Sequence, residues 1–203
     1  VPLGEWIIGR ACDDATLWPD DVKLAVNLSP VQFKQAELFD VIQSALARSG
    51  LDPKRLEIEI TESVLLERAA ENESFIDRLK GLGISLALDD FGTGYSSLSH
   101  VHRLPLDKLK VDRSFVHDVN ANPISHKIIK SLTGLCADME ISCVAEGVET
   151  KEQLDSLRRL GADYIQGYYF AEPMPADAVS GFLAKERQRF AEPVGVKVAG
   201  ASA

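Results

Sequence analysis

The sequence predicts an α/β fold in which strands and helices alternate along the chain. Six short apolar runs of strand length alternate with longer segments whose apolar residues follow helical spacing. Strict alternation indicates a parallel sheet covered by helices, either an open doubly wound sheet or a closed barrel. The chain has 203 residues, of which 45% are hydrophobic and 26% charged, and this composition suits one domain with a sizeable core.

Glycine and proline mark the element boundaries expected in the first half of the chain. Ser29 and Pro30 are typical of a helix start, whereas Gly50 and Gly81 are typical of helix ends. In chain order we expect a helix at residues 1–18, a strand at 23–28, a helix from 29 to 50, a strand at 56–60 and a helix that ends at 81.

The second half of the chain continues the same alternation. In order, we expect a strand at 84–88, a short helix before Pro105, a strand at 106–111, a helix at 128–136, a strand at 141–145, a helix that Gly161 ends, a strand at 164–166 and a last helix around 179–183. Residues 193–203 are small, weakly apolar and without periodicity, which predicts a flexible tail after a domain at 1–192.

Polar residues at the strand ends favour the barrel over the open sheet. They are Asn27, Glu59 with Glu62, Asp89 with Asp90, Lys110 with Asp112, Glu146 with Glu149, and Gln166. A (β/α)₈ barrel draws its active site from many strand ends, whereas an open sheet concentrates it in one crevice. A closed barrel needs two strands more than the six in this sequence, and we expect them before Val1.

Asp89 and Asp90 indicate a metal site. They end an apolar strand and precede a loop containing Gly92 and Gly94. Side chains of adjacent residues in an extended chain point to opposite sides, so the chain must turn here if both carboxylates are to serve neighbouring cations. Carboxylate oxygens suit Mg²⁺ or Mn²⁺. A plain strand end is the structural alternative, because Asp and Gly also favour turns.

Composition excludes several classes of partner. The net charge of −9 opposes nonspecific binding to nucleic acid, so we expect no DNA partner, and an anionic substrate would need cations as intermediaries. Cys12, Cys136 and Cys143 lack CxxC spacing, which favours reduced thiols that pack in the core. No apolar run approaches the roughly 20 residues of a membrane span. We therefore expect a cytoplasmic domain without direct membrane contact. A membrane anchor elsewhere in the parent protein is compatible with this expectation.

Seven stretches of the sequence resemble the EAL domain, the cyclic di-GMP phosphodiesterase module of bacteria. They are PLGEW at Pro2, VNLSP at Val26, EITES at Glu59, DDFGTGYSSL at Asp89, LKVDRSFV at Leu109, AEGVET at Ala145 and QGYYFAEPMP at Gln166. The resemblance implies a modified TIM barrel with one antiparallel strand, whose first strands are missing from the given chain. It also implies hydrolysis of cyclic di-GMP to linear pGpG with two Mg²⁺ or Mn²⁺ ions.

The resemblance further implies a role for each matched residue. One ion would be held by Asn27, Glu59 and Asp89, and a second by Asp89, Asp90 and Glu146. Lys110 and Gln166 would contact the attacking water, Glu62 would anchor the loop after Asp90, and Glu149 and Pro173 would line the guanine end of the site.

Lys110 and Glu146 differ in the chemistry they can perform. A protonated lysine cannot accept a proton, so we expect Lys110 to orient the water or stabilise the transition state, and Glu146 to act as the base. The structural alternative for Lys110 is a surface lysine, against which its apolar neighbours Leu109 and Val111 argue.

The resemblance also has departures and an alternative. The Glu-x-Leu-x-Arg strand that names the family is expected before Val1, and Glu172 stands where a basic residue is common. The expected partners are cyclic di-GMP, a second copy in a homodimer, and sensory or diguanylate-cyclase-like domains of the parent protein. The alternative function is a catalytically impaired EAL domain that binds cyclic di-GMP as a sensor.

Overall fold

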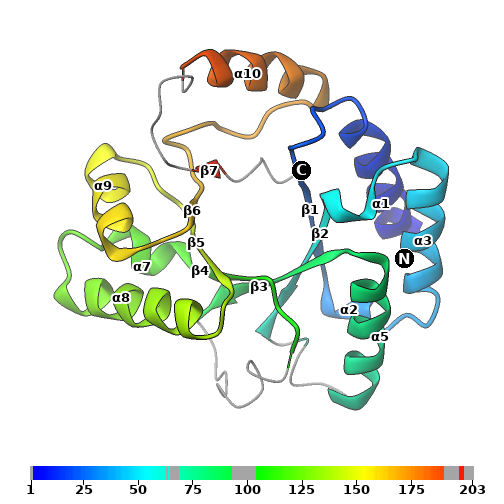
Figure 1. Ribbon diagram of the computed structural model, residues 1–203, viewed down its shortest axis with the longest axis horizontal. Helices are drawn as coiled ribbons and strands as arrows, with labels where there is room; N and C mark the ends of the chain where they lie inside the picture. Colours follow the sequence, from blue (N-terminus) through cyan, green and yellow to red (C-terminus); the bar gives the residue numbers. More distant parts are fainter. Residues whose placement is uncertain (1, 63, 65–68, 93–103, 190–196, 199–203) are drawn as a thin grey trace.

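Seven parallel strands form a curved sheet with helices on its outer side in the computed structural model (Figure 1). The structure describes residues 2–62, 64, 69–92, 104–189 and 197–198. Neighbouring strands follow chain order from β1 to β7, and each pairing is parallel. Within the described residues the sheet is an incomplete barrel with β1 and β7 at its edges, which confirms the predicted fold class.

The strands are short and mostly buried on both faces, as expected for a parallel sheet covered by helices. They are β1 (Leu24–Leu28), β2 (Leu56–Thr61), β3 (Ser85–Phe91), β4 (Lys108–Val111), β5 (Ser142–Ala145), β6 (Tyr164–Ile165) and β7 (Lys197–Val198). All four residues of β4 and the first five of β2 are buried. Polar side chains on these two strands therefore lie inside the molecule.

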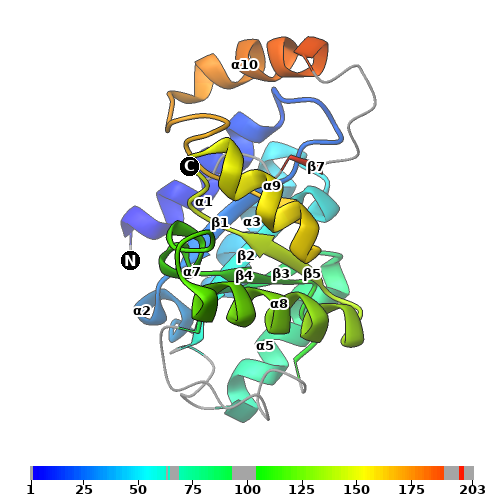
Figure 2. The same ribbon diagram turned by 90° about the vertical axis from the view of Figure 1, so that its left-hand side faces the viewer.

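The helices surround the sheet (Figures 1 and 2). They are α1 (Pro2–Ala15), α2 (Pro30–Phe33), α3 (Leu38–Ser49), the 3₁₀ helix η1 (Pro53–Arg55), α5 (Ala69–Leu82), α7 (Arg113–His117), α8 (Pro123–Asp138), α9 (Lys151–Leu160) and α10 (Ala176–Arg189). Ser29 caps α2 through a capping box with Gln32, and Gly50 and Gly161 end α3 and α9 in left-handed conformations. These three boundaries were predicted.

Several predicted helix boundaries are wrong. Two helices, α2 and α3, replace the single helix expected from 29 to 50, because the polar or small residues 34–37 bury no large side chain. Helix α5 continues through Gly81 and ends at Leu82, before Gly83 with a φ of 91°. Helix α7, which Asp112 caps by accepting the Ser114 N–H, was not predicted. Short polar segments carry too weak a periodicity to show such elements.

The predicted tail contains a strand. Residues Lys197–Val198 form β7 and pair with Tyr164 and Ile165 of β6, so the expectation of no element within 193–203 is wrong at these two positions. The short helix expected before Pro105 falls on residues 93–103, which lie outside the described residues.

The core contains the three cysteines and an aromatic contact between two helices. Cys12, Cys136 and Cys143 are free and buried, as predicted for packing thiols. The rings of Phe33 and Phe75 lie 4.8 Å apart in an edge-to-face contact that joins α2 to α5. In the described residues, no helix combines the length and the apolar character that a membrane crossing requires.

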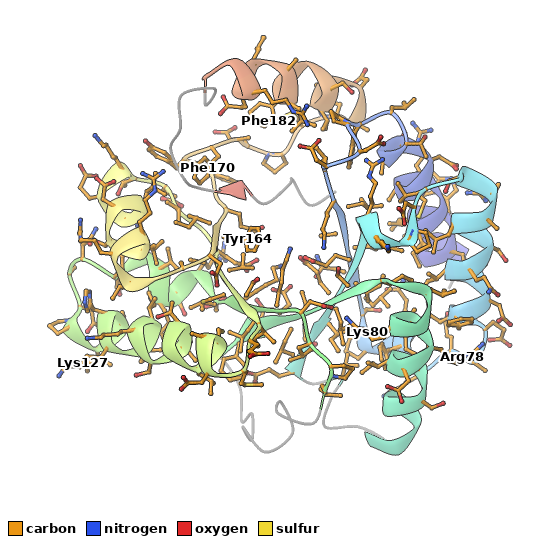
Figure 3. All side chains as sticks on the ribbon, in the orientation of Figure 1. Arg78, Lys80, Lys127, Tyr164, Phe170 and Phe182 are labelled. Atoms are coloured by element: carbon orange, nitrogen blue, oxygen red, sulfur yellow. The ribbon has the colours of Figure 1, made fainter. Side chains whose placement is uncertain are left out.

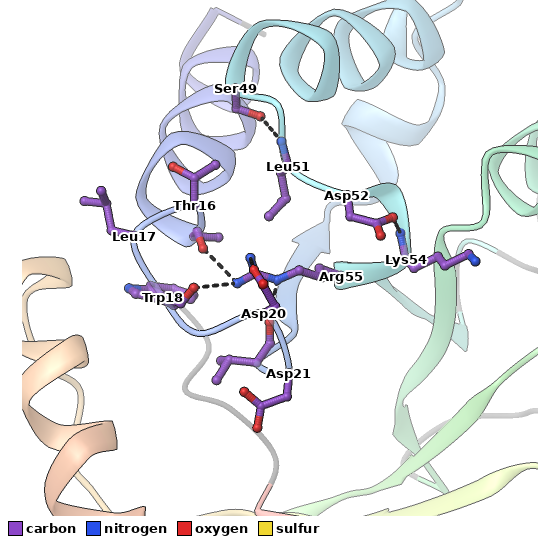
Figure 4. Close-up of polar contacts among 12 residues, drawn as sticks. Thr16, Leu17, Trp18, Asp20, Asp21, Ser49, Leu51, Asp52, Lys54 and Arg55 are labelled. Atoms are coloured by element: carbon purple, nitrogen blue, oxygen red, sulfur yellow. Dashed lines mark hydrogen bonds and ion pairs between the residues drawn. The ribbon is translucent and has the colours of Figure 1, made fainter.

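Arg55 ties the segment between α1 and β1 to the start of β2 (Figure 4). Its guanidinium donates to the carbonyls of Ala15 at 2.8 Å, Val22 at 3.0 Å and Trp18 at 3.4 Å, and it pairs with Asp20 at 3.4 Å. The Arg55 side chain is 11% exposed. Because one buried side chain provides several donors, Arg55 satisfies carbonyls that would otherwise lose hydrogen bonds on folding.

Replacing Arg55 with Met should lower the free energy of unfolding by about 3 kcal/mol, since buried carbonyls would lose their donors. The measurement is urea denaturation followed by circular dichroism. Arg48→Met is the control, because Arg48 and Asp13 form an exposed ion pair that contributes under about 1 kcal/mol. Equal losses in the two variants would contradict the role given to Arg55.

Candidate metal and catalytic site

The carboxylates at the end of β3 approach each other because the strand bulges. Asp89 and Asp90 stand opposite the single residue Lys110 of β4, so the register shifts between Leu88 and Phe91. Asp90 has a φ of 56°, a left-handed conformation that turns the chain after Asp89. This turn agrees with the expectation that adjacent carboxylates can serve one site only where the strand turns.

Lys110 lies at the centre of the site. Its Nζ is 2.6 Å from Oε2 of Glu59, 3.0 Å from Oδ1 of Asp89 and 2.8 Å from Oε1 of Glu146. These carboxylates come from β2, from β3 and from the residue after β5, so β4 connects to three other strands. The Lys110 side chain is 4% exposed, which excludes the alternative of a surface lysine.

Gln166, directly after β6, extends this group. Its Nε2 donates to Oε1 of Glu146 at 2.6 Å. Two backbone hydrogen bonds fix its position, from Gln166 N to the Ala145 carbonyl at 2.9 Å and from Val148 N to the Gln166 carbonyl at 3.1 Å. Gly167 permits this close approach, because it has a φ of 154° and a Cβ there would overlap the backbone of Val148.

Glu62 holds the chain that follows β3. Its Oε1 accepts a hydrogen bond from Gly92 N at 3.0 Å. Two features favour glycine at position 92. Its φ of 99° is a backbone conformation that other residues rarely adopt, and a Cβ there would come within 2.9 Å of the Phe115 ring. The contact agrees with the anchoring role expected for Glu62. The rest of the glycine-rich loop, residues 93–103, lies outside the described residues.

Burial and mutual repulsion raise the pKa values of the acids. Burial raises the pKa of Glu146 to about 7, although Lys110 opposes this shift. Burial, with repulsion from Asp89, also raises the pKa of Glu59 and Asp90. Burial would lower the pKa of Lys110, but attraction to the three surrounding carboxylates outweighs it and raises that pKa. The raised pKa of Lys110 favours its charged form next to Glu59 and Glu146, whose raised pKa values oppose their ionisation.

The acids fit a divalent cation. One carboxylate oxygen each from Asp89, Asp90 and Glu146 lie within 4.8 Å of one another. This cluster offers only hard oxygen donors, which suit Mg²⁺, Mn²⁺ or Ca²⁺ rather than the sulfur and nitrogen sites of zinc. Ionised acids held close together repel one another, and a bound cation would remove that repulsion.

Three further predicted site residues are exposed. Asn27 of β1 is exposed and in register with Glu59 of β2. Glu149 and Pro173 are also exposed, in the segments after β5 and β6 respectively. The assignment of Asn27 to a metal and of the other two to the guanine end stays a prediction.

The sequence analysis missed a second charged pair inside the sheet. Lys108 Nζ lies 2.8 Å from Oε2 of Glu57, and both residues are buried. A signal was present, because Glu57 and Lys108 precede Glu59 and Lys110 by two residues, and alternate residues of a strand share a face.

Comparisons with known proteins give the same family throughout. The family model of the EAL domain matches residues 1–173. The bifunctional diguanylate cyclase/cyclic di-GMP phosphodiesterase MucR of Pseudomonas aeruginosa is 38% identical over 188 residues, 91% of this chain and 27% of MucR. The matched region is thus 27% of the length of MucR, and it is 22% of the length of each of two further curated relatives, from Sinorhizobium fredii and Caulobacter vibrioides.

Solved structures agree with the sequence relatives. The PaMucR phosphodiesterase in complex with c-di-GMP matches with a TM-score of 0.83 and 39% identity, over 87% of this chain and 73% of that one. The manganese/cy-diGMP complex of Klebsiella pneumoniae BlrP1 at pH 9.0 matches with a TM-score of 0.78 and 32% identity, over 85% and 44% of the two chains. Since the family model covers most of the sequence and the folds coincide, this chain belongs to the EAL domain family.

Proposed function

We propose that this EAL domain hydrolyses cyclic di-GMP to linear pGpG with the help of Mg²⁺ or Mn²⁺. The observation that carries the proposal is the group of buried carboxylates around Lys110, with the Asp89, Asp90 and Glu146 oxygens close enough to share a cation. The names of MucR and of the cyclic di-GMP phosphodiesterase NbdA, and the c-di-GMP complex of PaMucR, support this substrate.

The resemblance implies two cations in this site. Asn27, Glu59 and Asp89 would hold one, while Asp89, Asp90 and Glu146 would hold the other. Bound Mg²⁺ or Mn²⁺ would supply an activated water and relief of the charge on the phosphoryl oxygens. The manganese complex of BlrP1 supports divalent cations of this kind.

Lys110, Glu146 and Gln166 have distinct roles in the proposed reaction. Lys110 stays charged, so it orients the water and stabilises negative charge in the transition state. Glu146 is the proposed base that accepts the proton of the water. Lys110 and Gln166 both bind Oε1 of Glu146, which fixes the orientation of this carboxylate.

We place the domain in a larger bacterial signalling protein with sensory or diguanylate-cyclase-like domains. Its relatives MucR and the oxygen sensor DosP of Escherichia coli support this placement, since the matched region is 27% of the first and 23% of the second. We further propose the cytoplasmic location expected from the sequence and the homodimer that the family resemblance implies.

Asp89→Asn should reduce pGpG formation by more than about 100-fold, beyond the range typical of residues that only support a metal ligand. The measurement is mass spectrometry of the products from cyclic di-GMP and Mn²⁺, made on the natural protein that contains this chain. Asp52→Asn is the control, because Asp52 caps η1 and Asn caps equally well. Turnover that survives Asp89→Asn would refute the metal assignment, and tight binding without product in the wild type would favour the sensor alternative.

Lys110→Met should destabilise the metal-free protein by about 3–5 kcal/mol, since buried carboxylates would lose their cation. Mn²⁺ should restore part of this loss because it returns positive charge to the same acids. Thermal unfolding with and without Mn²⁺ measures both effects. Equal shifts of Tm by Mn²⁺ in the variant and the wild type would contradict this charge balance.

The affinity for Mn²⁺ should rise with pH between about 6 and 8, because Glu146 with its pKa of about 7 must lose a proton to bind a cation. The stability of the metal-free fold has the opposite dependence. In the metal-free fold the pKa of Glu146 is about 7, above its ordinary value of 4.5. Between these two pH values the folded state binds more protons than the unfolded state, so the free energy of unfolding falls as pH rises. Calorimetric titration and thermal unfolding across this range check both trends, and Glu146→Gln should flatten them.

A further inference from the structure

Polar residues on the inner face of the sheet form two layers on the same three strands. The upper layer consists of Glu59, Lys110 and Gln166, on or directly after β2, β4 and β6. The lower layer consists of Glu57, Lys108 and Tyr164, on β2, β4 and β6. Each lower residue precedes its upper counterpart by two positions, so both layers lie on the inner face of the sheet. The lower layer therefore repeats the arrangement of the site one step deeper.

Lys108 connects the three strands of the lower layer. Its Nζ lies 2.8 and 2.9 Å from the two carboxylate oxygens of Glu57 and 4.7 Å from the centre of the Tyr164 ring. The Lys108 and Glu57 side chains are only 11% and 5% exposed. Figure 3 shows Tyr164 directed toward the centre of the ring of strands. A buried cation thus lies between a carboxylate and an aromatic ring.

A small residue of β3 allows the ion pair to span that strand. Ala87 is buried between β2 and β4, where it is in register with Glu59 on one side and Lys108 on the other. Ala87 also shares the inner face with Asp89, which lies two residues later. The lower ion pair therefore joins β2 to β4 across the inner face of β3, on which Asp89 follows Ala87 by two residues.

A buried ion pair of this kind contributes little net free energy to folding. Desolvation of two buried charges offsets most of their attraction, and apolar residues in their place are often equally stabilising. Lys108 Nζ donates to Oε1 of Glu57 at 2.9 Å and lies 2.8 Å from Oε2, which is buried and accepts no hydrogen bond among the described residues, so this pair joins β2 to β4. Glu57 also retains the charge of Lys108 one layer below Glu59 and Asp89, which leaves these carboxylates to Lys110.

We propose that Glu57 and Lys108 are positioning residues for the metal site. They hold β2 and β4 at the relative position in which Lys110 reaches Glu59 and Asp89, and they do so from across β3. This inference rests on the proposed function, because the site that they position is the proposed metal and catalytic site.

The test compares two single variants that change the net charge in opposite directions. Glu57→Gln and Lys108→Met should each weaken Mn²⁺ binding and lower kcat by about 10-fold, the range for residues that support a metal ligand, with KM for cyclic di-GMP unchanged. An effect of charge alone would weaken Mn²⁺ binding in the first variant and strengthen it in the second. The affinity is measured by calorimetric titration of Mn²⁺ into the natural protein that contains this chain.

Two further variants separate positioning from stability. Glu57→Leu combined with Lys108→Met should keep Tm near the wild-type value while Mn²⁺ binding stays about 10-fold weaker. Lys80→Met is the matched control, because Lys80 pairs with Asp107 outside the layers, and it should leave Mn²⁺ affinity unchanged.

The outcomes are distinct. Unchanged Mn²⁺ affinity in the double variant, or opposite changes in the two single variants, would overturn the positioning role. A wild type that binds Mn²⁺ but does not cleave cyclic di-GMP would refute the proposed reaction, while the affinities of the variants would still decide the inference. A wild type that binds no Mn²⁺ would overturn both proposals.

Discussion

The contact of one buried lysine with three carboxylates is the interaction on which the site depends. Lys110 Nζ lies within 3.0 Å of Glu59, Asp89 and Glu146, which come from different parts of the chain. Without that cation, buried acids at such short range would repel one another and take up protons. The lysine thus allows the carboxylates to lie as close together as a divalent cation also requires. One lysine neutralises only one of these acids, so negative charge remains for a divalent cation to bind.

Local backbone features turn this charge balance into a defined geometry. The bulge at Asp89 and Asp90 places two residues of β3 opposite one of β4, and the positive φ of Asp90 redirects the chain. Gly167 lets the chain after β6 lie against Val148, which brings Gln166 to Glu146. Each device lies where a strand ends, so the regular sheet below is undisturbed.

The sheet itself provides the frame, and its interior is less apolar than the interior of an ordinary barrel, which branched apolar residues fill. In this chain Glu57 and Lys108 occupy positions inside the strands, and their contact with each other makes this burial tolerable. Arg55 acts in a comparable way outside the sheet, where its guanidinium satisfies the carbonyls between α1 and β1. In the described part of the chain, the buried cations Arg55, Lys108 and Lys110 are therefore each paired with an acid or hydrogen-bonded several times.

The sequence alone determined the alternation of strands and helices and the positions of the strand-end acids. Apolar periodicity and glycine boundaries are local properties, so β1 to β6 and the caps at Ser29, Gly50 and Gly161 could be predicted. The motifs also indicated Glu59, Asp89, Lys110 and Glu146. Tertiary structure alone decided that Lys110 joins these acids, that Glu57 pairs with Lys108 and that residues 197–198 pair with β6. Such contacts depend on register and twist across neighbouring strands, and a one-dimensional pattern does not contain them.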